Sequence, residues 1–148
     1  MSVQNVKENE QDCLLLTVDD KNSANVYLFG AHVTSWRHCG EEQLFVSSTA
    51  VYDGKKAIRG GIPLVFPQFS RPLMTMPQHG FARNSMWTKY SESVDPNSVS
   101  VTFALRDSAS TLKVFPHAFC VLYTVKLSRG ELSLNFAVEN PDSAPSPF

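Results

Sequence analysis

A strict alternation of large apolar with small or polar side chains runs through the second half of the chain, and it constrains the fold more than any other feature. Every second residue is a large hydrophobe in three segments: Val99, Val101, Phe103 and Leu105; then Phe119, Val121, Tyr123, Val125 and Leu127; then Leu132, Leu134, Phe136 and Val138. Because successive side chains of a β-strand point to opposite faces, this period of two predicts three strands, each with one apolar face. We expect Gly130 to supply the positive φ of a tight hairpin, so that the last two strands pair antiparallel.

Shorter apolar runs in the first half predict further strands over 14–18, 26–28, 31–36 and 44–46, with a break at Gly30. No segment combines helical periodicity with capping residues. Many short strands separated by turn residues predict an all-β fold, either a sandwich or a barrel. The length of 148 residues predicts a single domain over 1–148, with a polar segment at 1–12 and a loop or linker in the proline- and serine-rich end, 140–148.

The segment 58–81 breaks this pattern, because it carries four prolines and three glycines. Proline removes a ladder donor and fixes φ, so the segment cannot be regular sheet. Long loops of fixed shape on a β-scaffold are often binding sites. Its apolar residues Ile62, Leu64, Val65 and Phe66 predict that it packs onto the scaffold.

Composition and charge exclude several kinds of partner. Lysine and arginine total 13 and aspartate and glutamate 14, for a formal net charge of -1, which favours neither a nucleic-acid binder nor an electrostatic membrane anchor. The polar start of the chain does not fit a signal peptide, and no apolar run approaches the ~20 residues of a membrane helix. Three cysteines without a CxxC pair predict neither a disulfide framework nor a zinc site. We therefore expect a reduced, cytoplasmic protein whose cysteines are buried or inert.

Four residues of the loop region and its end are candidates for ligand binding. Arg59 and Arg83 could clamp a phosphate, since a guanidinium matches its oxygens in a bidentate way; the alternative is a pair of surface or salt-bridging arginines. Gln78 and His79 offer donors and acceptors for sugar hydroxyls, although a histidine in such a place is often hydrogen-bonded for structural reasons. The other histidines receive no assignment, and the scattered carboxylates are expected to be solvated turn residues.

The segments 30–36, 58–69 and 77–84, followed by Trp87, resemble the glucose-6-phosphate 1-epimerase family of the aldose-epimerase, or galactose mutarotase-like, superfamily. The match runs in order from about Leu14 to Phe148. It implies an antiparallel β-sandwich of the galactose-mutarotase type and interconversion of the α and β anomers of a hexose 6-phosphate, without metal or cofactor. By position, Arg59, Gln78 and Arg83 would bind substrate, and His79 would lie near the sugar.

Members of that family are longer and, as the resemblance implies, monomeric. Their catalytic acid is a histidine in a His-Thr-Tyr-like strand and their base is a glutamate, both beyond the point that matches Phe148. The chain has no such His-Thr-Tyr segment, so we expect a truncated isoform, a partial gene model or a fragment that carries the substrate-binding part and is inactive alone.

Two other interpretations stay open: a non-catalytic carbohydrate-phosphate binding module, and a plain β-sandwich interaction domain. An incomplete sandwich would also have unpaired strand edges and an uncovered apolar face, which predicts poor solubility or self-association.

Overall fold

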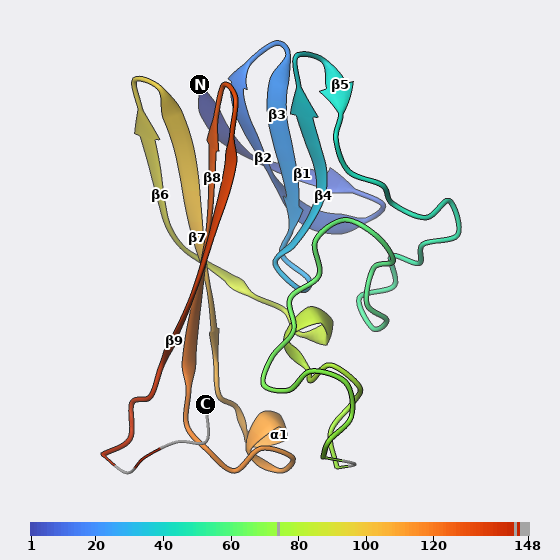
Figure 1. Ribbon diagram of the computed structural model, residues 1–148, viewed down its shortest axis with the longest axis vertical. Coiled ribbons are helices and arrows are strands. Elements are labelled where there is room, and N and C mark those ends of the chain that lie inside the picture. The colour runs from blue at the N-terminus through green and yellow to red at the C-terminus, as the bar shows by residue number, and fades with distance from the viewer. Residues whose placement is uncertain (74, 144, 146–148) are drawn as a thin grey trace.

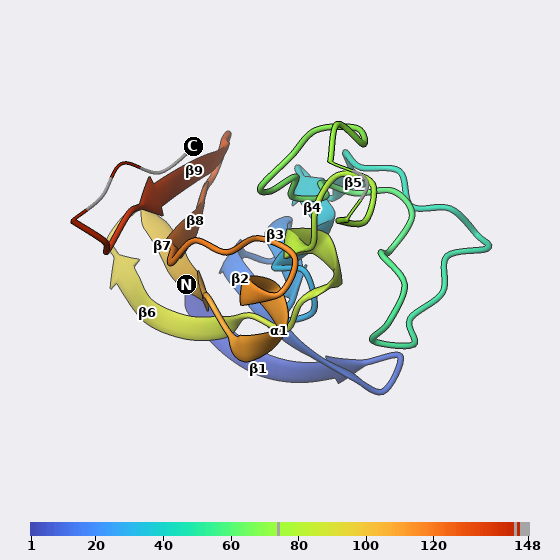
Figure 2. The same ribbon diagram turned by 90° about the horizontal axis from the view of Figure 1, so that it is seen from below.

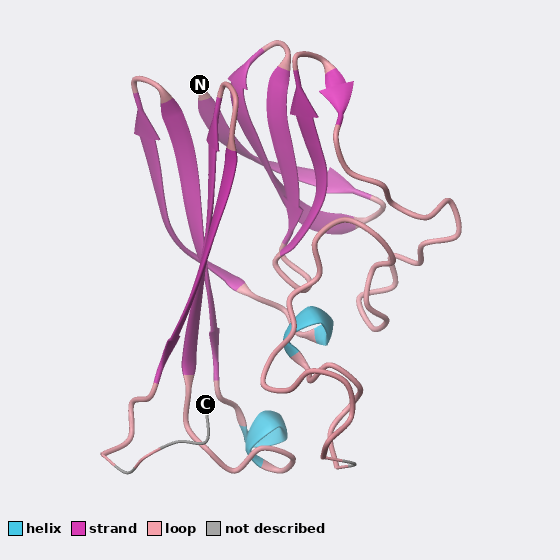
Figure 3. Cartoon of the chain, viewed as in Figure 1, coloured by secondary structure: helices cyan, strands magenta, loops and turns pink. Residues whose placement is uncertain are grey.

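The computed structural model describes residues 1–73, 75–143 and 145, and it contains two antiparallel sheets that face each other (Figures 1 and 3). The strands are β1 (Ser2–Glu8), β2 (Gln11–Asp19), β3 (Asn22–Tyr27), β4 (His32–His38), β5 (Glu41–Glu42), β6 (Thr88–Asp95), β7 (Ser98–Arg106), β8 (Cys120–Ser128) and β9 (Leu132–Glu139). Strands β1 to β5 form one sheet and β6 to β9 the other, each in chain order. Among the described residues the helices are the 3₁₀ turn η1 (Ala82–Asn84) and the short α1 (Ala109–Leu112). The predicted all-β sandwich is therefore confirmed.

The alternating apolar residues form the inner face of the four-stranded sheet. Pairing of β7 with β8 places Val101 opposite Val125, and pairing of β8 with β9 places Leu134 opposite Val125 on the other side. This face packs on β2 and β3 of the facing sheet, where Leu16 and Val26 are fully buried. Each such buried aliphatic side chain stabilises the fold by roughly 1.5–3 kcal/mol, so the inter-sheet core holds the sandwich together.

Three strands were not predicted from the sequence, the two-residue β5 among them, and one predicted strand was wrong. Strands β1 and β6 are sheet edges, and β6 is exposed along its whole length, so neither shows an apolar alternation. The expected strand over 44–46 does not form: the last strand of its sheet is β5, and Val46 makes only an isolated bridge to Gly60. The one-turn helix α1 was also missed, although Ser108 and Thr111 form a capping box at its start.

The hairpin between β8 and β9 forms as predicted, but not by the predicted means. The Ser128 N–H donates to the Glu131 carbonyl at 2.9 Å and closes a tight turn. Gly130 is not among the residues with positive φ. A tight turn in which both central residues have negative φ is the commonest kind and needs no left-handed residue, so the expected role of Gly130 was wrong.

The connection between β5 and β6 is irregular and lies on the opposite side of the molecule from β9 (Figure 2). As predicted, it packs onto the sandwich: Leu64 and Phe66 are buried and Ile62 is partly buried. Val65 is an exception, because its side chain points outward and is 39% exposed. Of the predicted C-terminal loop, residues 140–143 and 145 are described and contain neither helix nor strand; the rest lies outside the described residues.

The inner face of β9 is only partly covered. Leu134, Phe136 and Val138 alternate along it and are each between 36% and 39% exposed. An apolar row of this kind next to an open strand edge is typical of an association surface. Self-association of the 148-residue chain stays a prediction, now with a defined surface.

The conformation of the β5–β6 connection should require glycine at position 80. A Cβ there would lie 2.0 Å from the Phe66 carbonyl oxygen, and φ of Gly80 is +74°. We expect Gly80→Ala to lower the free energy of unfolding by about 2–4 kcal/mol, from a left-handed backbone and a backbone clash together. Gly130→Ala is the matched control, since no atom lies within 4 Å of its Cβ, and it should change stability by less than about 0.5 kcal/mol. Urea unfolding measures both; equal effects would contradict the assignment.

Candidate functional site

Arg59 begins a short backbone strip, residues 59–62, that is held by backbone hydrogen bonds on both sides. Its carbonyl accepts a hydrogen bond from the Ser47 N–H at 3.0 Å, and the Ile62 N–H donates to the Val33 carbonyl of β4 at 2.9 Å. Gly61 allows this approach, because a Cβ there would lie 2.2 Å from the Val33 oxygen. The exposed Arg59 side chain therefore projects from a rigid base.

His32, at the start of β4, lies beneath this strip. Its side chain is completely buried, and its Nε2 lies 2.6 Å from the Gly60 carbonyl oxygen. Burial, reinforced by the nearby charge of Arg83, lowers the pKa of His32 below its ordinary value, against the opposing effect of the Gly60 contact. No role for this histidine could be predicted from the sequence, because its partner is a backbone carbonyl 28 positions away.

Arg83 is placed by η1, which is held by buried contacts. The Phe81 and Ala82 N–H groups both donate to the Phe66 carbonyl, and the buried indole of Trp87 donates to the Ala82 carbonyl at 2.9 Å. The Arg83 guanidinium donates through Nη2 to the Gln78 carbonyl at 3.0 Å. This bond ties the arginine to the loop that carries Gln78.

His79 is hydrogen-bonded, as the structural alternative predicts, and it also reaches the site. The ring Nδ1 of His79 accepts from the Ser70 backbone N–H at 2.9 Å, and the backbone N–H of His79 donates to the Ser70 carbonyl at 2.7 Å. In the neutral ring the proton is therefore on Nε2. The exposed Gln78 side chain makes no hydrogen bond to any other described residue, so its amide is available to a ligand.

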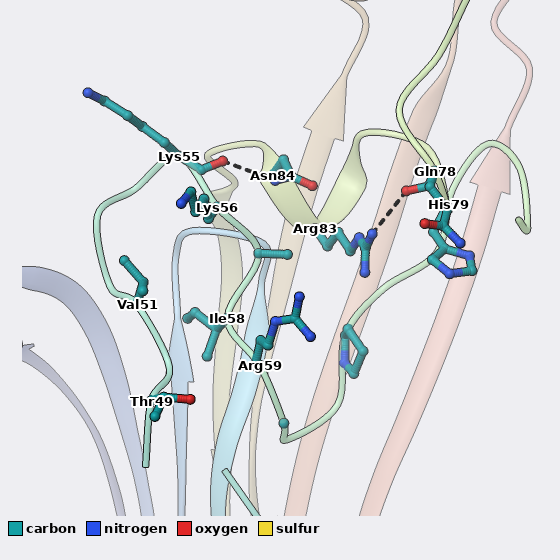
Figure 4. Close-up of a pocket in the computed structure, with 13 residues that line it drawn as sticks. Thr49, Val51, Lys55, Lys56, Ile58, Arg59, Gln78, His79, Arg83 and Asn84 are labelled. Atoms are coloured by element: carbon teal, nitrogen blue, oxygen red, sulfur yellow. Dashed lines mark hydrogen bonds between the residues drawn. The ribbon is translucent and has the colours of Figure 1, made fainter. Parts of the chain in front are cut away.

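All four predicted binding residues line one cavity of about 610 Å³. Its walls are Thr49, Val51, Lys55, Lys56, Ala57, Ile58, Arg59, Gly60, Pro63, Gln78, His79, Arg83 and Asn84. Figure 4 shows Arg59, from a loop, and Arg83, from η1, extending toward the same space, while Lys55 extends away from both. No carboxylate is among these lining residues, and within the described chain neither arginine forms an ion pair. The salt-bridging half of the alternative was therefore wrong, whereas the other half, that these are surface arginines, stays open.

The sequence did not single out Lys55, Lys56 or Asn84 as site residues. Asp53 orders the lysine turn, since its Oδ1 accepts from the N–H groups of Lys55 and Lys56, both at 2.8 Å. These hydrogen bonds lower the pKa of Asp53. The Asn84 amide donates to the Lys55 carbonyl at 3.0 Å and joins this turn to η1. The Asp-Gly-Lys-Lys sequence that precedes Arg59 could have suggested this turn, because aspartate and glycine are common turn residues.

The remaining predicted features lie apart from the cavity. Cys13 and Cys120 are buried as expected, and burial raises the pKa of Cys13 to about 12, but Cys39 is exposed. In the described part of the chain, no three His, Cys, Asp or Glu side chains lie close enough together to hold a metal ion. The described helices include none that is long and apolar enough to cross a membrane.

Solved structures define the class of protein to which this sandwich belongs. A provisionally named mutarotase, YeaD from Salmonella typhimurium, superposes with a TM-score of 0.80 at 32% identity, over 91% of this chain and 46% of that one. The protein Slr1438 from Synechocystis has the same fold, with a TM-score of 0.79 at 24% identity. The structure is that of a mutarotase-like β-sandwich.

The family follows from the sequence comparison. Residues 12–148 match the aldose 1-epimerase family, and the chain belongs to it. Two curated relatives carry the provisional name glucose-6-phosphate 1-epimerase: one from Cenchrus ciliaris is 41% identical over 132 residues, and one from Escherichia coli is 40% identical over 111 residues. The aligned parts are 84% and 73% of this chain, but only 40% and 38% of those relatives. The chain thus corresponds to the N-terminal part of such proteins.

Burial of neutral His32 should make stability depend on pH. Above its unfolded pKa of about 6.5 the ring is neutral in both states. Below that value the unfolded chain takes up the proton first, because the folded pKa is lowered, so stability should fall as the pH falls below about 6.5. Urea unfolding of the wild type and of His32→Gln at pH 7.5, 6.5 and 5.5 tests this; curves that stay parallel would contradict it.

Proposed function

We propose that this cavity binds a hexose 6-phosphate, such as glucose 6-phosphate, and that proteins with the full length of the relatives interconvert its α and β anomers. Arg59 and Arg83 would bind the phosphate, and Gln78, with a smaller contribution from His79, would bind the sugar. One observation supports this most: two arginines from separate loops line one cavity without any carboxylate among its described lining.

The charge of the cavity suits a doubly negative ligand. Arg59 and Arg83 line it without an ion pair to any described residue, and no carboxylate is among the described lining. A phosphate monoester offers acceptor oxygens and carries close to two negative charges near neutral pH. Arginine forks match those oxygens, and hydrogen bonds between charged groups are about twice as strong as neutral ones. Such a ligand would therefore bring negative charge to a cavity whose described lining has cations but no carboxylate.

The polar groups around the arginines suit sugar hydroxyls. Gln78 presents a free amide with donors and an acceptor, and His79 presents Nε2–H when neutral. Asn84 uses its amide nitrogen to hold the Lys55 carbonyl, which leaves its side-chain oxygen as an acceptor. These groups surround a cavity large enough for a monosaccharide phosphate.

Mutarotation needs a base that takes the proton from the anomeric hydroxyl and an acid that protonates the ring oxygen. The described lining contains no carboxylate, and the Nδ1 of its one histidine is occupied by Ser70. This chain would therefore bind and orient the substrate but supply no acid–base pair. The same observation favours, as the second candidate, a non-catalytic sugar-phosphate binding module.

The binding proposal predicts that glucose 6-phosphate binds and glucose does not bind measurably. Arg59→Ala and Arg83→Ala should each weaken binding about 10- to 100-fold, because each removes a charge-assisted contact worth about 1.5–3 kcal/mol. Arg37→Ala, on an exposed face of β4 outside the cavity, is the control. Isothermal titration calorimetry measures all four chains. Unchanged affinity in both cavity variants would favour the plain interaction domain.

The chain alone should not accelerate the interconversion of glucose 6-phosphate anomers above the uncatalysed rate. General acid and base groups contribute about 10²–10⁴-fold each, and no carboxylate stands among the described lining residues to act as the base. A coupled assay that consumes one anomer measures this on the purified 148-residue chain, with a full-length relative as the positive control. A rate close to that of the relative would contradict the prediction.

A further inference from the structure

The two cavity arginines come from different loops, yet one buried side chain lies next to both. His32 is fully buried at the start of β4, below the strip that carries Arg59. The turn before it packs on the Arg83 segment: the Gly30 N–H donates to the Ser85 carbonyl at 2.7 Å. A Cβ on Gly30 would lie 2.8 Å from the Arg83 carbonyl oxygen. His32 is therefore close to the backbone of both arginines.

Its contact with the first loop determines which ring nitrogen carries the proton. Nε2 lies 2.6 Å from the Gly60 carbonyl oxygen, which can only accept a hydrogen bond. Nε2 must therefore donate, and this bond holds the peptide next to Arg59. Since burial and the Arg83 charge disfavour a second proton, Nδ1 is left as a bare acceptor.

Two buried polar atoms of opposite kind connect His32 with the segment that carries Arg83. His32 Nδ1 and Arg83 Nε are both inaccessible to solvent, and neither has a hydrogen-bond partner among the described residues. The first is an acceptor and the second a donor. Unpaired buried polar atoms are rare and costly, typically 1–3 kcal/mol each. A pair of opposite kinds on neighbouring segments points to a shared hydrogen-bonding partner.

We propose that His32 is the positioning residue of this cavity, which donates from Nε2 to the Gly60 carbonyl and accepts at Nδ1 through one buried water that the Nε–H of Arg83 also contacts. Arg83 is then held at two points, by His32 through this water at Nε and by the Gln78 carbonyl through Nη2. Its Nη1 group stays free for the ligand. The ring itself does not touch the ligand, and acts only by setting the separation of the two guanidinium groups.

The competing explanation is that His32 merely fills space under the loop. Two substitutions separate the explanations, because each keeps one half of the ring's hydrogen bonding. Glutamine places an amide nitrogen near the Nε2 position and keeps the bond to Gly60. Asparagine places its oxygen near the Nδ1 position and keeps the acceptor for Arg83. His32→Phe keeps the volume and removes both bonds.

The measurement is nuclear magnetic resonance of the ¹⁵N-labelled chain without ligand. The Arg83 Nε–H signal reports on the hydrogen bond at His32 Nδ1. The Gly61 N–H signal reports on the bond from His32 Nε2, because this N–H belongs to the same peptide group as the Gly60 carbonyl. In the wild type we expect the Nε2–H tautomer of His32 and an Arg83 Nε–H that exchanges at least about tenfold more slowly than that of the exposed Arg37. His32→Gln should release the Arg83 signal and leave Gly61 unchanged. His32→Asn should do the reverse, and His32→Phe should change both.

The wild-type measurement can refute the proposal even if the variants fail to fold. An Nδ1–H tautomer, or an Arg83 Nε–H that exchanges as fast as that of Arg37, would overturn it, and so would equal effects of His32→Gln and His32→Asn on the two signals. Inorganic phosphate and glucose 6-phosphate, titrated as probes, should bind each variant about tenfold more weakly. That titration rests on the proposed function, whereas the ligand-free spectra do not. Absence of binding to the wild type would therefore contradict the function and leave the role of His32 to be judged from the spectra.

Discussion

The close approach of loop backbone to the sandwich is the constraint on which the site depends. Gly61 lies where a Cβ would be 2.2 Å from the Val33 oxygen, and Gly80 where it would be 2.0 Å from the Phe66 oxygen. Both have left-handed φ, which side-chain-bearing residues adopt only at a cost. The two loops therefore lie directly on the core, and backbone hydrogen bonds fix the origin of each arginine. A cavity built from such loops is shaped before any ligand arrives.

This arrangement holds the positive charges of Arg59 and Arg83 in one cavity, and neutral backbone groups rather than carboxylates hold the surrounding chain in place. The Asp53 carboxylate accepts hydrogen bonds from backbone N–H groups of the lysine turn, and among the described residues it forms no ion pair with either cavity arginine. Arg83 is restrained by a carbonyl, which fixes its direction without neutralising it. Fixing donors through neutral partners keeps their charge available to a ligand, and it lowers the entropy that binding must overcome. The cavity is thus suited to hold an anion, because its described lining contains cations and amide groups but no carboxylate.

Much of the fold could be predicted because its signal is local. The alternation in β7, β8 and β9 is a property of neighbouring residues, and it correctly predicted three strands and their common apolar face. Strands β1 and β6 could not be found in this way. Each is an edge strand that owes its structure to the ladder of a partner strand, and a polar edge strand carries little trace of that pairing in its own residues. The prediction that Gly130 has positive φ was also wrong, since a glycine allows positive φ but does not require it.

For the site, residue types and a family resemblance were enough to nominate Arg59, Gln78, His79 and Arg83 and to suggest a phosphate ligand. The sequence alone thus determined the strand-forming core and the chemical character of the loop. Only the tertiary structure decided that the four residues line one cavity, that no described carboxylate pairs with the arginines, and that His32 lies beneath both loops. Those are relations between atoms distant in the chain, set by how loop backbone packs on a sheet, and no local pattern of residues encodes them.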